Sequence, residues 1–512
     1  MKEFEYTISE ALFGGLKQGV EVPINSNTLD RCFNLEPTPL GPIPHSFIID
    51  IASISESEIC GGWTSFVSTT GDWTSCWPWP QLRKLENGGL IGIALVYGTE
   101  NLGIFSLVTN EGSLVATLKA TIGNVLEVVG VDISEHYGYL LIGVHYTDNS
   151  IASWLTGVGL EVGSIVPVDM DLMPEFIAST IFKGQVILGG LSGKVGSVWE
   201  GLGKSSICWG GVGKMEFDPT TDKTSGWIPK IDCGGTIVKV HSFGEKVVVF
   251  STDGICILTP NEAGYSCDDL HMVGVATSRH VAGSDKVLGF VDNNFNFWMM
   301  KDSGEIKKLG YKHLIKPSEF ASYYDELVRI NVSFESSNGR FYIGNGIQCF
   351  VYNQFQMYET NQIASSVFAI SDGTLVGSVI NSSDTYGELI TSITDFNQRG
   401  MQTVGFVEFG GHLTRLAETM ATVSIGADYS YNMSEDFISA PYVQVGPEGV
   451  AYLGVTSSEF KFRVKISDYR KHNLSLKYLK ARVKLVDKRY IRGLTDVNYA
   501  GRGSGGRVLG SD

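Results

Sequence analysis

Lys246-Val-Val-Val-Phe-Ser-Thr-Asp-Gly-Ile-Cys-Ile-Leu258 decides the fold, because two apolar runs flank a short Thr-Asp-Gly break. Short runs rich in β-branched residues and separated by turn residues are typical of two antiparallel strands joined in a hairpin. Asp253-Gly254 suits a type I′ turn, because Asp and Gly tolerate a positive φ, and Asn345-Gly346 does so for the same reason. The stretch therefore predicts a β-hairpin.

The same hairpin design recurs along the chain. It is found in Gln185–Trp199, Lys286–Met300, Arg340–Tyr352 and, with a weaker second half, Thr374–Val379. From Val186 to Leu375 the first strands begin 61, 40, 54 and 34 residues apart. Hairpins at such intervals predict an irregular β-propeller, whose blades are small antiparallel sheets. A large β-sandwich is the alternative.

Composition supports an all-β chain. Of 512 residues, 61 are Gly, 43% are apolar and 18% are charged, against roughly 25% charged in typical domains. Helical periodicity is confined to 412–420 and 315–328, where short helices are expected. No apolar run approaches the roughly 18 residues of a membrane span, and the opening Met1-Lys-Glu-Phe-Glu-Tyr6 does not resemble a signal peptide.

Charge divides the chain. The net charge is −16, yet residues 459–512 hold 14 Lys+Arg against 5 Asp+Glu. Five of the 15 prolines precede residue 45, which favours extended backbone there. We expect an N-terminal platform segment at 1–55, a propeller-like body at 56–440, and a basic β segment with a flexible tail at 441–512. An acidic body argues against wrapping nucleic acid.

The sequence offers little catalytic chemistry. Gly203-Lys204-Ser205 lacks the upstream glycine of a phosphate-binding loop, and Gly501-x-Gly503-x-x-Gly506 lies in a polar tail without a strand–helix frame. The cluster Cys267, Asp268, Asp269 and His271 has no further zinc ligand at a matching spacing, so it is interpreted as a solvated turn. We therefore expect no enzyme activity, no cofactor and no metal.

Two alternatives stay open at the level of single residues. Paired carboxylates on a propeller would suit a glycan-active enzyme, and the candidates are Asp169, Asp171, Asp253 and Asp292. The eight cysteines contain no Cys-x-x-Cys and are expected to be small buried thiols in a reducing compartment.

Two surface features are candidate contact sites. Four tryptophans, Trp63, Trp73, Trp77 and Trp79, form either an exposed aromatic tip or a loop packed against a blade or a neighbouring subunit. Basic residues alternate with apolar ones along Leu474–Val486, so one face of this strand is cationic. That face suits either contact with DNA or docking to an acidic neighbour, and the docking residues are expected to be Lys477, Lys480, Arg482 and Lys484.

Two segments resemble a known protein family. Asn25-Ser-Asn-Thr-Leu-Asp-Arg-Cys-Phe-Asn-Leu-Glu-Pro-Thr-Pro-Leu-Gly41 resembles the opening of the tail hub or nozzle proteins of short-tailed bacteriophages, in which a stretch ending in Asn-Leu-x-Pro leads into a propeller. Val483-Lys-Leu-Val-Asp-Lys-Arg-Tyr-Ile-Arg-Gly493 is similar to the basic closing strands of that family.

The resemblance implies a structural virion protein. Such proteins form a homo-oligomeric ring, usually of six copies, beneath the portal and the tail adaptor. The ring retains the packaged double-stranded DNA and conducts it through the lumen during ejection, without sequence-specific binding. The expected location is the virion tail, after assembly in the host cytoplasm. A non-viral propeller scaffold that binds proteins or sugars is the alternative, beside the glycan-active enzyme.

Overall fold

The computed structural model divides the chain into two compact units. Phe47–Tyr352 with Gln362–Ser382 is named the propeller, and Met1–Ser46 with Asn353–Asn361 and Ser383–Asp512 is named the platform. Residues 383–440, which the sequence-based division assigned to the body, lie in the platform. The residues described are 3–8, 16, 29–38, 42–45, 48–50, 81–84, 90–96, 101–110, 113–124, 127–157, 165–262, 264–316, 330–345, 348–369, 375–381, 386–398, 400–415, 422–431, 436–467 and 472–487.

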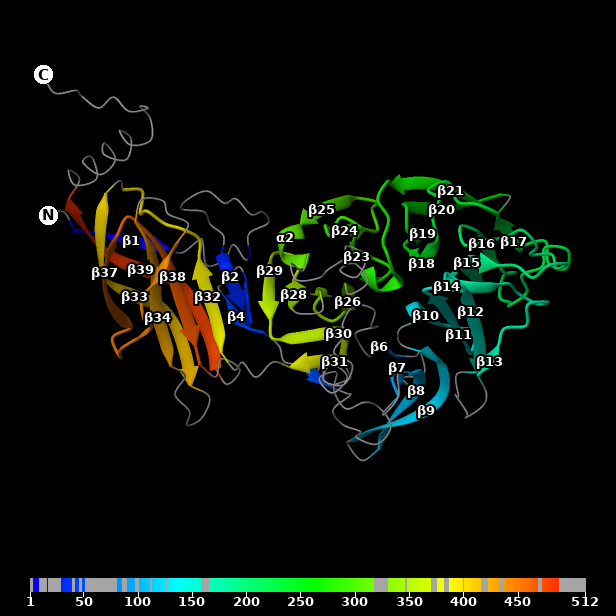
Figure 1. Cartoon of the computed structure of the whole chain (residues 1–512), viewed down its shortest axis with the longest axis horizontal. Helices are drawn as coiled ribbons and strands as arrows, with labels where there is room; N and C mark the ends of the chain where they lie inside the picture. Colours follow the sequence, from blue (N-terminus) through cyan, green and yellow to red (C-terminus); the bar gives the residue numbers. More distant parts are fainter. Residues whose placement is uncertain are drawn as a thin grey trace, which may run out of the picture. The chain divides into compact units, whose positions relative to one another are not determined.

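The described part of the propeller consists of seven successive sheets (Figure 1). The first sheet consists of β6 Gln81–Lys84, β7 Leu90–Leu95, β8 Asn101–Asn110 and β9 Ser113–Asn124. The second consists of β10 Val128–His136, β11 Tyr139–Tyr146, β12 Ile151–Gly157 and β13 Val166–Pro167. The third consists of β14 Glu175–Phe182, β15 Gln185–Ser192, β16 Ile207–Trp209 and β17 Gly226–Ile228. The fourth sheet consists of β18 Ile237–Phe243, β19 Lys246–Ser251, β20 Ile255–Asn261 and β21 Gly264–His271. The fifth consists of β22 Val281–Gly283, β23 Val287–Val291, β24 Phe297–Lys301 and β25 Ile306–Gly310. The sixth contains β26 Asn331–Glu335, β27 Arg340–Gly344 and β28 Cys349–Tyr352, and the seventh β30 Gln362–Ala369, β31 Leu375–Asn381 and β5 Ile48–Asp50.

These sheets form a closed ring. The first strand of a sheet packs against the first strand of the next at β10–β14, β14–β18, β22–β26 and β26–β30, and β30 packs back against β6. Buried side chains fill the other junctions, with one cluster shared by the first and second sheets and another by the fourth and fifth. The predicted β-propeller is therefore confirmed. In the seventh sheet, β5 pairs parallel with β31, so a strand from the N-terminal part completes the last blade.

Packing on both faces explains the apolar runs that predicted the strands. Val247, Val248, Val249 and Phe250 of β19 are all fully buried, where a strand with one wet face would alternate. Strands β19 and β20 confirm the predicted hairpin, but its turn is not type I′. Phe250 pairs with Ile255, so four residues bridge the strands, and neither Asp253 nor Gly254 has a positive φ.

The platform contains two larger sheets. One has the order β1 Glu3–Ile8, β39 His472–Asp487, β33 Met401–Arg415 and β37 Val450–Ser457. The other has the order β29 Met357–Thr360, β2 Leu29–Phe33, β32 Gly387–Thr391, β38 Glu459–Ile466, β34 Val423–Ser430 and β35 Ile438–Ser439, with β36 Val443–Gln444 also on β34. A short pair joins β3 Leu35–Glu36 to β4 Ile43–Pro44. The first and last described strands, β1 and β39, pair antiparallel, so both ends of the chain build this unit, as predicted.

Aromatic residues connect the two platform sheets. Phe396 lies 5.1 Å from Tyr6 of β1 and 5.3 Å from Phe460 of β38, measured between ring centroids. Phe460 and Phe462 are buried, whereas the intervening Lys461 is only partly buried, as the alternating sequence of this strand predicts.

The helix predicted at 412–420 was wrong where it can be checked, and 317–328 of the other predicted helix lie outside the described residues. Residues 412–415 belong to β33, because they pair with β39, and 416–420 lie outside the described residues. Near 315–328, the described residues contain only α2, Lys312–Ile315. None of the helices in the described residues is long and apolar enough to cross a membrane.

Candidate functional site

The predicted docking residues lie on the outer face of strand β39. Its buried residues include Leu479, Ala481 and Val483, so the intervening cations point away from the platform core. Lys480 Nζ lies 2.6 Å from a carboxylate oxygen of Glu5, and Arg482 Nε lies 3.2 Å from one of Glu3. Two of the four predicted docking cations are therefore paired within the chain, a feature that the sequence analysis missed.

This pairing shifts the pKa values of both partners. The hydrogen bond from Lys480 holds the pKa of Glu5 below its usual value and raises the pKa of Lys480. Lys477 and Lys484 are exposed, and neither forms an ion pair with a described residue.

Aromatic side chains share this face. The Arg482 guanidinium lies 5.4 Å from the Phe406 ring centroid, and Phe406 lies 6.0 Å from Tyr452, which is 65% exposed. Tyr478 donates a hydrogen bond to Glu408 (3.1 Å). We call this surface of β1, β39, β33 and β37 the outer platform face. Exposed Tyr452 and Arg482 on this face are of the residue types enriched at protein interfaces.

The second basic strand, β38, is neutralised within the platform. Lys461 pairs with Asp30, and Arg463 Nε lies 3.0 Å from Asp428. Lys465 Nζ lies 3.7 Å from the Tyr386 ring centroid, in a cation–π contact. The basic C-terminal strands therefore do not form one free cationic surface.

The Glu388 carboxylate binds two neighbouring side chains in the platform. Glu388 accepts hydrogen bonds from Arg31 Nη1 and the Tyr442 hydroxyl. Burial, together with Glu388, raises the pKa of Tyr442, so the phenol stays neutral and keeps donating. These contacts tie β2 and β32 to Tyr442, and the Arg463 guanidinium of β38 lies 4.6 Å from the centroid of the Tyr442 ring, which gives this basic residue a structural role.

The first strands of the propeller sheets share a buried polar cluster. Lys239 of β18 forms an ion pair with Asp132 of β10, and the backbone N–H of Ser179 in the intervening β14 donates to the same carboxylate (3.0 Å). Ser278, in the 3₁₀ turn η2 (Ser278–His280) before β22, donates to the Val131 carbonyl (3.2 Å). Polar contacts therefore connect the inner strands of several sheets and link the turn before β22 to β10.

The candidate carboxylates are not brought together as a catalytic pair. Asp169 accepts from the backbone N–H of Asp171, and Asp171 pairs with Lys194 (2.7 Å), before the third sheet. Asp253 is exposed in the β19–β20 turn. Asp292, in the β23–β24 turn, accepts from Trp298 Nε1 (2.7 Å) and from two backbone amides. Each has a local structural partner or faces solvent.

The interpretation of Cys267–His271 as a turn was wrong, because these residues form strand β21. His271 packs 4.5 Å from the Trp298 ring, and burial lowers its pKa. The loop residue Lys204 donates to the Asn149 carbonyl, and its own carbonyl accepts from Ile237. Its role in the described structure is therefore to hold a loop. Trp63, Trp73, Trp77, Trp79 and Gly501–Gly506 lie outside the described residues.

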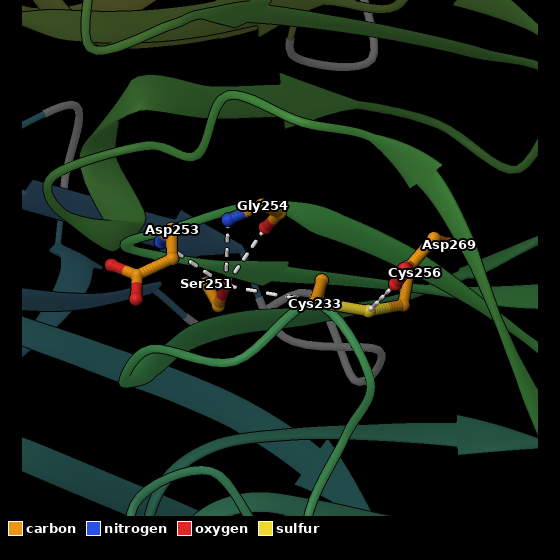
Figure 2. Close-up of a disulfide and its surroundings, with 6 residues drawn as sticks. All are labelled: Cys233, Ser251, Asp253, Gly254, Cys256 and Asp269. Atoms are coloured by element: carbon orange, nitrogen blue, oxygen red, sulfur yellow. Dashed lines mark hydrogen bonds between the residues drawn. A yellow bond between two sulfur atoms is a disulfide. The ribbon is translucent and has the colours of Figure 1, made fainter.

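A disulfide joins Cys233 to Cys256 (Figure 2). The expectation of reduced thiols was therefore wrong for this pair, because the fold brings together two cysteines 23 residues apart. Asp269 Oδ1 lies 3.7 Å from Cys256 Sγ, and these two residues with Cys233 are a grouping of possible metal-ligating atoms. Both sulfur atoms are bonded to each other, so neither is a free thiolate ligand. The other described cysteines, Cys32, Cys208, Cys267 and Cys349, are free.

The sequence matches no protein-family model and no curated protein. Among solved structures it is similar to PorZ, a surface component of the type-IX secretion system of Porphyromonas gingivalis, with 10% identity, 59% of this chain, 34% of that chain and a TM-score of 0.30. AztD from Citrobacter koseri is 9% identical, and the match covers 59% of this chain and 90% of that chain with a TM-score of 0.31. An exo-β-1,3-galactanase from Phanerochaete chrysosporium is 10% identical, and the match covers 78% of this chain and 81% of that chain with a TM-score of 0.23. This chain thus spans about a third of PorZ. Likenesses this distant carry no functional argument, and the propeller assignment depends on the strand order and packing of this chain.

Proposed function

We propose that this chain is a structural subunit of a short-tailed phage tail, in which several copies form a ring that holds and conducts packaged DNA. The observation that carries the proposal is the pairing of β1 with β39, because it makes one platform from both chain ends with a propeller inserted between them. The two segments that resemble tail hub or nozzle proteins come from those chain ends. The described part of the first segment includes β2, and the second begins in β39.

The charge distribution supports a passive wall. The propeller segments contain 20 Lys+Arg against 34 Asp+Glu, a net charge of −14, which leaves −2 for the platform. An acidic wall repels phosphates and so lowers the friction on passing DNA. Polar contacts connect the inner strands of the propeller, so we place the DNA path in the lumen between subunits and not along a propeller axis.

The outer platform face supports ring formation. A ring needs heterologous contacts, in which one surface of a subunit binds a different surface of the next. Lys477 and Lys484 supply cations on β39 that have no ion pair with a described residue, and an acidic propeller of the neighbouring copy is a complementary partner.

Electron microscopy of the purified chain, alone and mixed with portal and adaptor proteins, tests the proposal. We expect ring-shaped particles with a central lumen and no retention of double-stranded DNA at physiological salt. A chain that stays monomeric with both partners present would overturn the tail role. Tight DNA binding would overturn the passive-wall argument.

A further inference from the structure

The Cys233–Cys256 disulfide fastens the linker between two blades. Cys233 lies in residues 229–236, which connect β17 of the third sheet to β18 of the fourth, and Cys256 lies in β20. Cys256 is fully buried, whereas Cys233 is partly exposed. The bond therefore attaches a partly exposed linker to the interior of the fourth blade.

Hydrogen bonds on both sides of Cys233 hold the linker in addition to the disulfide. On one side, the backbone N–H of Ile231 donates to the Ser205 carbonyl (2.9 Å). On the other, the N–H of Thr236 donates to Thr252 Oγ1 (3.0 Å), and the N–H of Thr252 donates to the Thr236 carbonyl (2.9 Å). These bonds flank Cys233 on both sides, so the fold itself places it opposite Cys256.

The neighbouring backbone leaves room for Cys233. A Cβ on Gly254 would stand 2.9 Å from the Cβ of Cys233 and 3.0 Å from the His271 carbonyl oxygen. The turn is fixed around this space by Ser251, whose hydroxyl accepts from the Gly254 N–H (3.0 Å) and donates to the Gly254 carbonyl (2.9 Å). Glycine is thus required at position 254 by close packing, since its φ is not positive.

A third cysteine lies near the pair without joining it. Cys267 of β21 pairs with Leu258, and Asp269 pairs with Cys256, so Cys267 is a diagonal neighbour of Cys256 on the same face of the sheet. Burial raises the pKa of Cys267 to about 11. The disulfide nevertheless joins Cys256 to Cys233 and leaves Cys267 a free thiol.

We propose that Cys233 and Cys256 are an oxidation site of the already folded propeller, which folds with both as thiols and closes the disulfide afterwards. With oxidised glutathione, the Cys233 thiolate attacks one glutathione sulfur and expels a glutathione thiolate. The Cys256 thiolate then attacks Cys233 Sγ in the mixed disulfide and expels the second. Two electrons pass to glutathione and the two thiols lose their protons. Cys233 reacts first because it is the more exposed. This proposal does not depend on the tail role.

The experiment uses the full chain, purified under anaerobic reducing conditions and then treated with oxidised glutathione. Peptide mapping after alkylation of free thiols identifies the bonded cysteines, circular dichroism reports the fold, and thermal denaturation reports stability. We expect the reduced chain to show the same β-sheet spectrum as the oxidised one. Treatment should join Cys233 to Cys256 and raise the denaturation midpoint by roughly 5 °C, since the cross-link restricts the unfolded chain.

Matched variants isolate the pair. Cys267→Ser should close the same disulfide with the same yield and the same shift, whereas Cys233→Ser should fold and show neither. Three results would overturn the proposal: a reduced wild-type chain without β-sheet signal, a bond that includes Cys267, or a persistent mixed disulfide with glutathione. The reduced wild-type measurement decides whether folding precedes oxidation even if Cys233→Ser misfolds.

Discussion

Gly143 of β11 lies directly against the backbone of Ile177 in β14, so that a Cβ at position 143 would stand 2.3 Å from the Ile177 carbonyl oxygen. The same relationship recurs between other blades. A Cβ on Gly189 of β15 would stand 2.6 Å from Val240 of β18, and one on Gly289 of β23 would stand 2.6 Å from Phe341 of β27. The second strands of these three sheets therefore have a glycine where the next sheet crosses them.

We predict that Gly143→Ala destabilises the propeller by about 1–3 kcal/mol, because backbone must shift to admit the methyl group. Urea unfolding followed by circular dichroism measures the change. Gly157→Ala is the control, since nothing lies within 4 Å of a Cβ at that position, and it should be nearly neutral. Equal losses of unfolding free energy in the two variants would show that the close approach of the blades does not set the cost of the substitution at position 143.

The Asp132–Lys239 pair gives a second prediction. The side chains are 3% and 17% exposed, so Lys239→Met leaves a buried carboxylate without its cation. We expect a loss of about 3–5 kcal/mol in the free energy of unfolding. The exposed pair Asp171–Lys194 is the matched control, and Lys194→Met should cost about 0–1 kcal/mol. A small effect at Lys239 would mean that solvent reaches Asp132.

A buried histidine makes stability depend on pH. His145 is 9% exposed, and burial holds its pKa below the ordinary value of about 6.5, although a hydrogen bond with Asn149 opposes this shift. The folded chain therefore favours neutral His145. Its contribution is complete above about pH 6.5 and is lost as the pH falls through the folded pKa, because the unfolded chain binds the proton first.

Unfolding free energies at pH 7.5, 6.5 and 5.5 test this sign. We expect the wild-type chain to lose more stability on acidification than His145→Gln, which keeps a polar group beside Asn149. If the unfolding free energies of the wild-type chain and of His145→Gln changed in parallel with pH, His145 would not contribute to the pH dependence of stability. His271 also has a pKa lowered by burial, so the variant should retain part of the dependence.

Local patterns in the sequence were sufficient to predict the architecture. Apolar runs such as Val247–Phe250 predicted strands correctly, because blades stack on both faces and select continuous apolar residues. Glycines such as Gly189 were part of the same pattern, but their reason, contact with the next blade, depends on tertiary packing. The turn at Asp253-Gly254 was assigned to the wrong type because glycine is needed at position 254 for close packing against Cys233, which is a tertiary contact.

The candidate site shows the same division. Alternation predicted that Lys480 and Arg482 face outward from β39. It did not predict their partners Glu3 and Glu5, which lie almost a full chain length away and are brought there by strand pairing. The Cys233–Cys256 contact was missed because neither local spacing nor composition encodes which blade residues meet.

The pairing on β39 sharpens the charge test of ring assembly. We predict that replacing both Lys477 and Lys484 with Ala weakens ring formation while leaving the free energy of unfolding within about 0.5 kcal/mol, because neither cation has an ion pair with a described residue. The matched variant replaces Lys480 and Arg482 with Ala, which also releases Glu5 and Glu3 as unpaired carboxylates on the same face. If an acidic neighbour docks here, this second pair should weaken assembly more at low salt, because it removes two cations and exposes two anions. Analytical ultracentrifugation at low and high salt measures both variants. Rings of unchanged stability in both would exclude β39 as the docking strand.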